Sequence, residues 1–389
     1  MYDFTFQNET KIYFGENQLK NLGTEIKKYG KKVLLTFGGG SIKKIGLYDK
    51  VIKELEDNGM EIFELSGIEP NPRHTTVNKG AEICKKENID VILAVGGGST
   101  IDCSKVISAA TFYDGDAWDL VVHKAEVTKT LPLLTVLTLS ATGSEMDSGG
   151  VISNLETNEK YGLLHPLMQP KVSFLDPTVT YSVNAFHTAC GSVDIMSHIL
   201  DVYYLTKNEK MFMVDSVMET VLKTVYKYSQ IAVKEPENYE ARANLMWASS
   251  WALNNFLTSG GGQAPTCHAM EHELSAYYDI THGLGLGILT PRWLEYILND
   301  ETKASIYKLG VNVFNIENDL DEMIGAKKTI DFIHHFFYNI LGLQSTLTEI
   351  GINEENFEKM AINCTKGGIL PGYIHLTKED VINIYKMCL

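Results

Sequence analysis

Several side chains in the second half of the sequence have the types and spacing of metal ligands. Asp194 and His198 are four positions apart, about one helical turn, so both would project from one face of a helix. Three more histidines, His268, His272 and His282, follow in the segment CHAMEHELSAYYDITHG. One carboxylate and three of these four imidazoles would form a donor set that suits Fe(II), Zn(II), Co(II) or Ni(II). We therefore expect one divalent transition-metal site.

The same segment also permits a different chemistry. His268-Ala-Met-Glu271-His272 matches the pattern HxxEH, in which two histidines bind zinc and the glutamate activates water for peptide hydrolysis. This hypothesis leaves Asp194 and His198 without a role. A zinc metallopeptidase stays open as an alternative function.

Two GGGS tetrapeptides form a second kind of site. Gly38–Ser41 and Gly96–Ser99 each follow an apolar, strand-like run and precede a helical segment. Glycines there let backbone N–H groups approach a phosphate, and the following helix directs its positive end at the charge. We expect Ser99 and Thr100 to cap the second of these helices and to offer hydroxyls to a pyrophosphate. Neither loop matches GxGxxG or the GK[ST] of a P-loop, yet two such loops in one sheet favour a dinucleotide ligand.

A third stretch of small polar residues, TLSATGSE over 138–145, follows another apolar run. Its hydroxyl groups, on Thr138, Thr142 and Ser144, could hydrogen-bond a phosphate or the nicotinamide end of a dinucleotide. Such a composition is also ordinary for loops, so this stretch supports the dinucleotide hypothesis only together with the GGGS loops.

The first half of the chain alternates strand-like and helix-like blocks, which predicts a parallel sheet covered by helices on both faces. The expected strands are Lys32–Phe37, Met60–Leu65, Asp90–Val95, Leu131–Leu137 and Val172–Leu175, and the clearest helices between them are Leu47–Asp57 and Thr75–Glu87. Ahead of this alternation, Asp3–Gln7 and Lys11–Phe14 flank Asn8-Glu9-Thr10 and predict a β-hairpin.

The pattern changes after Asp176-Pro177, where helical periodicity replaces the alternation. The expected helices are Ala185–Tyr204, Lys210–Val233, Tyr239–Leu257, Gly283–Leu298 and Leu320–Leu341. We therefore predict two domains: an α/β domain with the hairpin over residues 1–180, and an all-helical domain over 181–389.

The amino-acid composition argues against two classes of binding partner. The 389 residues contain 34 Lys and Arg against 49 Asp and Glu, a net charge of −15, which disfavours nucleic acid and anionic membrane surfaces. The six cysteines have no CxxC spacing and indicate reduced thiols. We see neither a signal peptide nor an apolar run long enough for a membrane span. These observations predict a cytoplasmic protein.

Six segments of the chain form a recognisable set: FGGGSIKK (37–44), EPNP (69–72), AVGGGSTID (94–102), TLSATGSE (138–145), GSVDIMSH (191–198) and HAMEHELSAYYDITHG (268–283). The set resembles the iron-containing, or group III, alcohol dehydrogenases, and in particular the butanol dehydrogenases and aldehyde reductases among them. The resemblance implies a Rossmann-like dinucleotide-binding domain followed by a helical metal-binding domain, the dehydroquinate synthase-like fold. It implies hydride transfer between NAD(P)(H) and a small primary alcohol or aldehyde.

The resemblance also assigns residues, position by position. It places the metal ligands at Asp194, His198, His268 and His282, and it places His272 beside the site as a proton relay or as a structural hydrogen-bonding residue. The cofactor positions are those of the pyrophosphate loop (Gly97, Gly98, Ser99), of the residues lining the cofactor (Thr138, Thr142, Lys160) and of the adenosine end (Gly38, Gly39, Gly40, Ser41, Asn71).

Three further expectations follow from the resemblance. Gly39 stands where an acidic residue that selects NADH would be, so we expect a preference for NADPH with NADH also accepted. Members of the family commonly dimerise through the amino-terminal hairpin, which implies a homodimer. The superfamily also contains dehydroquinate synthase-like lyases, but we see no basic cluster for a phosphorylated substrate near the metal motifs, so a lyase is a minor alternative.

Overall fold

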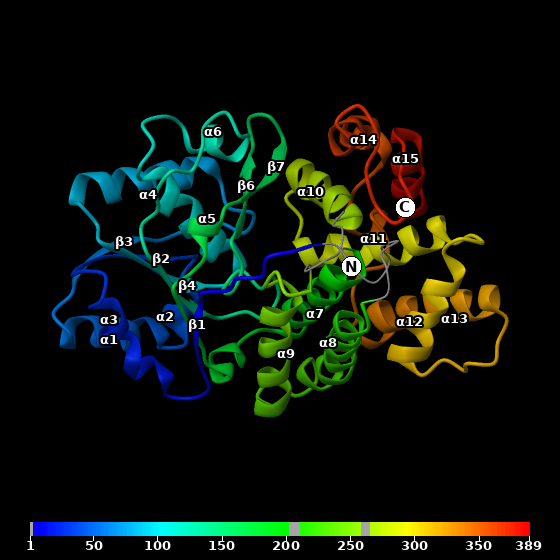
Figure 1. The fold of residues 1–389 in the computed structure, drawn as a ribbon, viewed down its shortest axis with the longest axis horizontal. Helices are drawn as coiled ribbons and strands as arrows, with labels where there is room; N and C mark the ends of the chain where they lie inside the picture. Colours follow the sequence, from blue (N-terminus) through cyan, green and yellow to red (C-terminus); the bar gives the residue numbers. More distant parts are fainter. Residues whose placement is uncertain (1–2, 202–210, 258–264) are drawn as a thin grey trace. The chain divides into compact units, whose positions relative to one another are not determined.

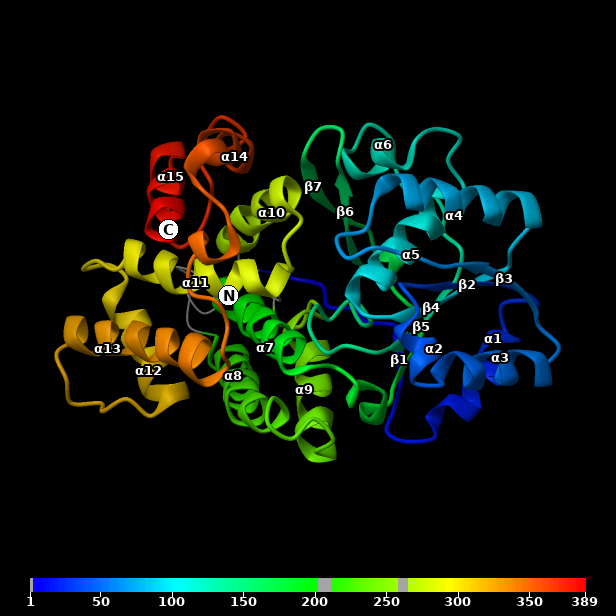
Figure 2. The same ribbon diagram turned by 180° about the vertical axis from the view of Figure 1, so that it is seen from behind.

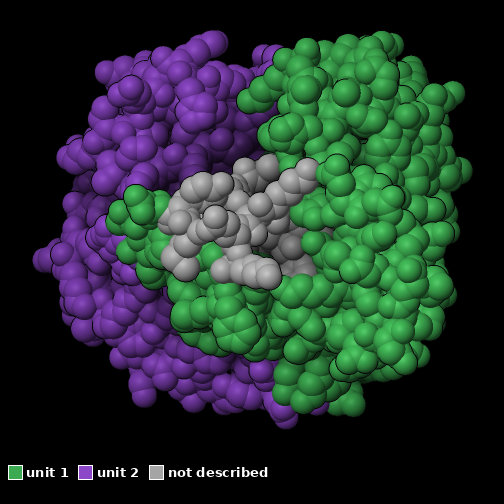
Figure 3. All heavy atoms as spheres, turned by 45° about the vertical axis from the view of Figure 1, so that its right-hand side comes forward, with its two compact units in different colours: residues 1–6, 184–236, 247–389 green, residues 7–183, 237–246 purple. Residues whose placement is uncertain are grey.

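The computed structural model describes residues 3–201, 211–257 and 265–389. The chain divides into two compact units, coloured separately in Figure 3. Unit 1 consists of Met1–Phe6, Asn184–Pro236 and Trp247–Leu389, and unit 2 of Gln7–Val183 and Glu237–Met246. Each unit is described by itself below.

Unit 2 is built on a six-stranded sheet in which every neighbouring pair of strands is parallel. The strand order is β1-β8-β5-β4-β2-β3. All five strands expected from the apolar runs are present, with ends shifted by no more than two residues. In chain order the strands are β1 (Lys11–Phe14), β2 (Lys32–Phe37), β3 (Glu61–Leu65), β4 (Val91–Gly96), β5 (Leu133–Leu137) and β8 (Val172–Leu175).

Helices cover both faces of this sheet, because the central strands are apolar on both sides. In β2, Leu34 faces one core with α4 (His74–Glu87), α5 (Gly98–Ala110) and α6 (Ala117–Val121). Its neighbours Val33 and Leu35 face the other core, with α1 (Leu22–Ile26), α2 (Ser41–Lys44) and α3 (Leu47–Asp57). Figures 1 and 2 show these helices from opposite sides. The predicted α/β class is confirmed.

The predicted amino-terminal hairpin is wrong. Residues 3–10 form no strand, and β1 pairs in parallel with β8 instead. The residues that were expected to form the turn bond to distant segments instead. The Asn8 amide donates to the Met146 carbonyl (2.8 Å), and the Thr10 hydroxyl donates to the Pro170 carbonyl (2.7 Å). These bonds lead the chain directly into register beside β8. A hairpin does occur later, between β6 (Gly149–Asn154) and β7 (Glu159–Leu164), where the sequence pattern did not predict one.

Unit 1 is helical, and its described residues contain no strand beyond one isolated bridge, Leu370 with Leu376. The helices are α7 (Ala185–Ile199), α8 (Phe212–Ala232), α10 (Thr266–Tyr278), α11 (His282–Ile297), α12 (Lys303–Phe314), α13 (Glu322–His334), α14 (Phe357–Thr365) and α15 (Lys378–Met387). A further helix, α9 (Tyr239–Ala252), contributes residues to both units.

Periodicity located the long helices better than the short ones. α7, α8, α9, α11 and α13 match the expected helices, although positions 202–204 and 210 of two expectations lie outside the described residues. α10 was not predicted, although it carries two of the candidate site histidines. Because α10 is buried over most of its circumference, its apolar residues do not form one stripe at helical spacing, which is the pattern that predicts a helix. None of the described helices combines the length and apolarity needed to cross a membrane.

Candidate functional site

α7 presents the first pair of predicted ligands. The Asn184 side chain caps this helix by accepting the His187 N–H, and the helix then runs through a buried stretch. Asp194 and His198 lie one turn apart on it and are 3% and 7% exposed. A carboxylate and an imidazole buried this deeply need partners or a bound ion.

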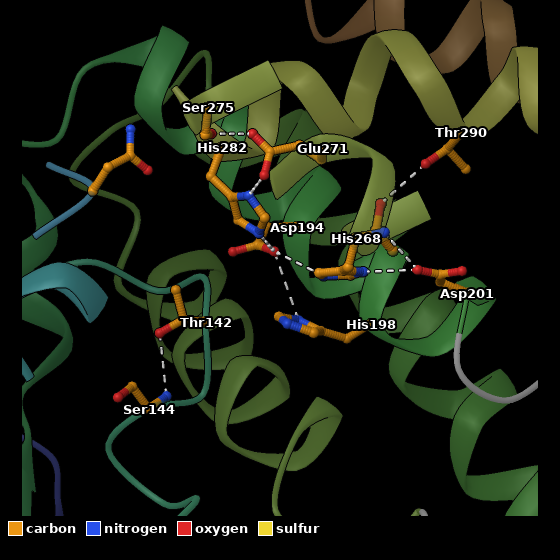
Figure 4. Close-up of polar contacts among 12 residues, drawn as sticks. Thr142, Ser144, Asp194, His198, Asp201, His268, Glu271, Ser275, His282 and Thr290 are labelled. Carbon is orange, nitrogen blue, oxygen red and sulfur yellow. Dashed lines mark hydrogen bonds and ion pairs between the residues drawn. The ribbon is translucent and has the colours of Figure 1, made fainter. Parts of the chain in front are cut away.

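Two other helices bring the remaining predicted ligands to the same point. His268 lies in the first turn of α10, and His282 is the first residue of α11. Oδ1 of Asp194 is 3.8 Å from Nε2 of His268 and 3.6 Å from Nε2 of His282. The same oxygen is 3.8 Å from Nδ1 of His198. Figure 4 shows the four side chains converging, so the structure brings together all four residues of the predicted set.

These atoms fit a divalent metal. Asp194 Oδ1, His198 Nδ1 and His268 Nε2 are buried and have no hydrogen-bond partner among the described residues. The ligand atoms of Asp194, His268 and His282 lie within 4.8 Å of one another. One oxygen and three nitrogens around a common point are a donor set for a first-row transition metal.

The electrostatics of the cluster follow from its burial and its one carboxylate. Burial opposes ionisation of Asp194, but the surrounding imidazoles prevail and hold the pKa of its carboxyl well below the usual range. Burial, reinforced by the two other histidines, lowers the pKa of His198 to about 3. His268 is also buried, yet its interactions with Asp194 and Asp201 raise its pKa to about 9. A charged Asp194 and a neutral His198 are the protonation states that a metal requires.

The HxxEH hypothesis does not fit this geometry. Glu271 is fully buried, and its two carboxylate oxygens are engaged by the Ser275 hydroxyl and by Nδ1 of His282. A glutamate that activates water must face the reacting water. His272 is half-buried, and its ring centroid is 5.7 Å from that of His282, so it lies beside the cluster.

In unit 2, the glycine loops meet at one edge of the sheet. Phe37, which precedes the first GGGS, is the register partner of Val95, which precedes the second. The chain runs from β2 to β3 on one side and then returns to place β4 on the other side of β2. The two loops therefore flank the point where the strand order reverses, a position that favours ligand binding in open parallel sheets.

The second loop has the features of a phosphate cradle. Gly97 precedes α5, and no side chain caps this helix. A Cβ on Gly98 would lie 2.4 Å from the Thr142 side chain, so only glycine fits there. The predicted capping by Ser99 and Thr100 is wrong, because α5 already begins at Gly98 and both residues lie inside its first turn. The backbone N–H groups at the start of α5 thus remain uncapped by side chains.

The third loop packs against the second. The Thr138 N–H donates to the Gly96 carbonyl (3.0 Å), and the Thr142 hydroxyl accepts the Ser144 N–H (3.2 Å). Ser144 does not serve a ligand as expected, because its side chain is buried and donates to Asp102. A neighbouring buried pair, Lys105 with Asp147 at 2.6 Å, ties α5 to the same loop.

The other predicted cofactor residues lie around the first loop and the later hairpin. A Cβ on Gly39 would meet no atom within 4 Å, whereas Gly40 has the left-handed φ of +98°. The Lys43 ammonium lies over the rings of Tyr48 and Phe37, at 4.3 and 5.1 Å from their centroids. Lys160 Nζ donates to Asn71 Oδ1 (2.9 Å), and both side chains are buried.

Comparison with protein families accounts for nearly the whole chain. The family described as iron-containing alcohol dehydrogenase matches residues 9–177, and the carboxy-terminal part of the same family matches residues 188–389. The chain belongs to the iron-containing alcohol dehydrogenase family. Neither match is to a peptidase or a lyase, so the comparisons give the two alternative functions no support.

Individual relatives of this alcohol dehydrogenase are similar over nine tenths or more of their length. NADH-dependent butanol dehydrogenase A of Clostridium acetobutylicum is 50% identical over 99% of both chains. NADPH-dependent aldehyde reductase YqhD of Escherichia coli is 36% identical over 91% of this chain and 90% of its own. The solved structure of NADH-dependent butanol dehydrogenase A from Thermotoga maritima superposes with a TM-score of 0.94, at 38% identity, over 100% of this chain and 99% of that one.

The sequence did not predict the contacts that two carboxylates of this alcohol dehydrogenase make with the histidines of the site. Asp201 bonds to His268 Nδ1 at 3.0 Å, and Glu271 contacts His282 Nδ1. Glu271 was considered only as a general base. Asp201 has a sequence signal, since it lies seven positions after Asp194 and thus on the same helix face. Its partner, however, lies more than sixty residues away in the chain, and no local pattern reveals that distance.

Proposed function

We propose that this alcohol dehydrogenase transfers hydride between a nicotinamide cofactor and a small primary alcohol or aldehyde, with butanol and butanal as the first substrates to test. The observation that carries the proposal is the convergence of three imidazole nitrogens to within 3.6–3.8 Å of one Asp194 oxygen. Two relatives that are 48% and 50% identical are NADH-dependent butanol dehydrogenases.

The metal would be held by Asp194, His198, His268 and His282. A divalent ion bound there supplies Lewis-acid polarisation of the alcohol or aldehyde oxygen. Fe(II), Zn(II), Co(II) and Ni(II) all accept one carboxylate and three imidazoles. The protein's own contribution is to present these donors on three packed helices, so that little reorganisation accompanies binding.

The cofactor would bind at the edge of the unit 2 sheet. We assign the pyrophosphate to Gly97, Gly98 and Ser99, since the start of α5 directs uncapped N–H groups there. Thr138, Thr142 and Lys160 would line the cofactor, and the adenosine end would contact Gly38–Ser41 and Asn71. The bound nicotinamide supplies or accepts the hydride. We accordingly assign cofactor binding to residues 1–180 and metal binding to 181–389.

Two observations bear on which nicotinamide cofactor the enzyme prefers, and they favour different cofactors. Position 39 holds glycine, so no carboxylate repels a 2′-phosphate, which favours acceptance of NADPH. Four relatives at 43–50% identity carry NADH-dependent in their names, which favours NADH. Our proposal is an enzyme that accepts both and prefers NADPH. The ratio of kcat/KM values for the two cofactors decides the preference.

We assign His272 to proton transfer, because it lies beside the metal ligands at 5.7 Å from the His282 ring. A purely structural role is the alternative. His272→Gln keeps hydrogen bonds but does not titrate. Proton transfer predicts a changed pH profile of kcat with metal content intact, whereas a structural role predicts lost metal or stability with an unchanged profile.

We also propose that the enzyme is a homodimer and that it is located in the cytoplasm. The family resemblance supports dimerisation, and the acidic composition with scattered cysteines supports a reducing compartment. Sedimentation of the purified protein tests the dimer, since a single species at twice the 43.4 kDa chain mass is expected.

The experiment that tests the activity is reduction of butanal by metal-reconstituted protein. The reaction is followed by loss of the near-ultraviolet absorbance of NADPH or NADH. We expect turnover that requires both cofactor and metal. Hydrolysis of a peptide substrate without cofactor, or no aldehyde reduction by protein with one metal per chain, would contradict the proposal.

A further inference from the structure

One carboxylate links the helix that carries two ligands to the helix that carries the third. Asp201 follows α7 and is 4% exposed. Its Oδ1 accepts the Cys267 N–H (2.8 Å), and its Oδ2 accepts the His268 N–H (2.8 Å). The residue before α10 is Pro265, which offers no side-chain cap, so Asp201 caps α10 from another helix.

The same carboxylate also bonds to the His268 ring. Nδ1 of His268 lies 3.0 Å from Asp201 Oδ2. An ionised carboxylate only accepts hydrogen bonds, so Nδ1 carries the proton in this pair. A histidine that binds a metal is neutral, and the lone pair of the neutral His268 ring is then on Nε2, the nitrogen that faces Asp194. Asp201 thereby fixes both the position and the tautomer of this ligand.

A second carboxylate repeats the arrangement between the next two helices. Glu271 lies on α10 and is fully buried, and it contacts Nδ1 of His282 on α11. The Ser275 hydroxyl donates to its other oxygen. Gly285 leaves room for it, since a Cβ there would lie 2.8 Å from Glu271 Cγ. By the same reasoning, Nε2 of His282 is left to face Asp194, at 3.6 Å.

The two contacts form a continuous series, visible in Figure 4, from α7 through Asp201 to α10 and through Glu271 to α11. We propose that Asp201 and Glu271 are positioning residues that join the three ligand-bearing helices and set the affinity of the site for its metal. The inference rests on the metal site of the proposed function and deepens it. Outer partners of this kind typically contribute about 10–100-fold to metal affinity.

The third imidazole provides a contrast within the same site. In His198 the nitrogen that faces Asp194 is Nδ1, at 3.8 Å, and not Nε2 as in His268 and His282. The two outer carboxylates act on the site through the other two imidazoles, His268 and His282. The His198 ring is stacked on the ring of His268, with the ring centroids 4.7 Å apart.

The test compares Asp201→Asn and Glu271→Gln with a capping control. Asp321 also caps a helix of unit 1, α13, by accepting the Met323 and Ile324 N–H groups, but it contacts no ligand. Asp321→Asn therefore reproduces the change at a cap without the change at the metal. Full-length proteins are stripped of metal and titrated with Co(II) against a chelator, and the visible spectrum of bound Co(II) is recorded.

We expect Asp201→Asn and Glu271→Gln to bind Co(II) about 10–100-fold more weakly with altered spectra, and Asp321→Asn to stay within about twofold of wild type. Wild-type affinity and spectrum in both variants would overturn the inference, as would an equal loss in Asp321→Asn. If Asp201→Asn does not fold, the affinity and spectrum of Glu271→Gln decide in the same way. Failure of the wild-type protein to bind one Co(II) per chain would instead contradict the proposed metal site itself.

Discussion

At the residue scale, single side chains decide which partner a site accepts. Gly39 follows the end of β2 in the first glycine loop, and a Cβ there meets no atom within 4 Å. Its φ is not left-handed, so a larger residue fits without strain. This position therefore allows a test of cofactor choice that does not disturb the fold.

We predict that Gly39→Asp shifts the ratio of kcat/KM values toward NADH by about tenfold or more, because a carboxylate repels a 2′-phosphate and accepts a bond from a ribose hydroxyl. Gly39→Asn is the matched control, since it has the same size without the charge and should shift the ratio far less. Equal ratios in wild type and Gly39→Asp would show that discrimination lies elsewhere.

Glu25 is the residue on which a pH effect on stability is clearest. Its carboxylate accepts bonds from Lys11 (2.7 Å) and Tyr13 (2.7 Å), which join α1 to β1, and from Lys28 (2.6 Å), three residues further along the chain. Burial alone would raise its pKa, but these three donors prevail and lower it from 4.5 to about 2. A lowered carboxyl pKa stabilises the fold above the unfolded value and stops doing so as pH falls through the folded value.

We predict that Glu25→Gln lowers the free energy of unfolding by about 1–3 kcal/mol at neutral pH. The deficit should shrink as pH is lowered from about 5 toward about 2, because the wild-type carboxyl then becomes protonated as well. Urea unfolding at several pH values measures it. Asp57→Asn, which removes an exposed pair with Lys53, is the control and should change stability by less than about 0.5 kcal/mol. A deficit independent of pH would contradict the assignment.

At the element scale, the geometry of the proposed metal site depends on how closely α11 approaches α7. Gly283 follows the proposed ligand His282, and a Cβ on it would lie 2.1 Å from the Cys190 carbonyl oxygen of α7. That atom belongs to the backbone and cannot turn aside. One turn later, a Cβ on Gly287 would lie 3.2 Å from Leu343 and 3.6 Å from Val193, both side-chain atoms that can move.

Gly283→Ala should therefore separate the two helices and weaken metal binding by about tenfold or more, with a loss of roughly 1–3 kcal/mol in stability from overpacking. Gly287→Ala is the matched control on the same helix face, and we expect it to keep its metal. Chelator competition and thermal unfolding measure the two effects. Retained metal affinity in Gly283→Ala would show that the helix contact does not position His282.

The sequence predicted some of these elements correctly and others not. The apolar runs located the strands of the parallel sheet, because strands buried on both faces read as continuous apolar segments. Helical spacing correctly paired Asp194 with His198, since both lie on one helix. The hairpin prediction failed because Asn8 and Thr10 bond to loops over 130 residues away, and Asp201 was missed for the same reason. Contacts between distant segments leave no periodic signal in the chain.

At the scale of the whole molecule, metal binding should appear as stability. The four proposed ligands come from three helices of unit 1, so an ion that binds only the folded arrangement stabilises that arrangement. We predict that removing metal with a chelator lowers the unfolding temperature, and that adding Co(II) at about 100 times its Kd restores about 2.7 kcal/mol. His282→Ala should show no such response. An unfolding temperature that is unaffected by metal in the wild-type protein would contradict a site built across these helices.

The central claim is that Asp194, His198, His268 and His282 hold one metal on which alcohol dehydrogenase activity depends. The most direct test measures metal content and butanal reduction on the same preparations of wild type and His268→Ala. We predict about one metal per chain with activity in the wild type, and loss of both in the variant. A His268→Ala protein that binds metal at wild-type stoichiometry, or that reduces butanal at the wild-type rate, would contradict the account.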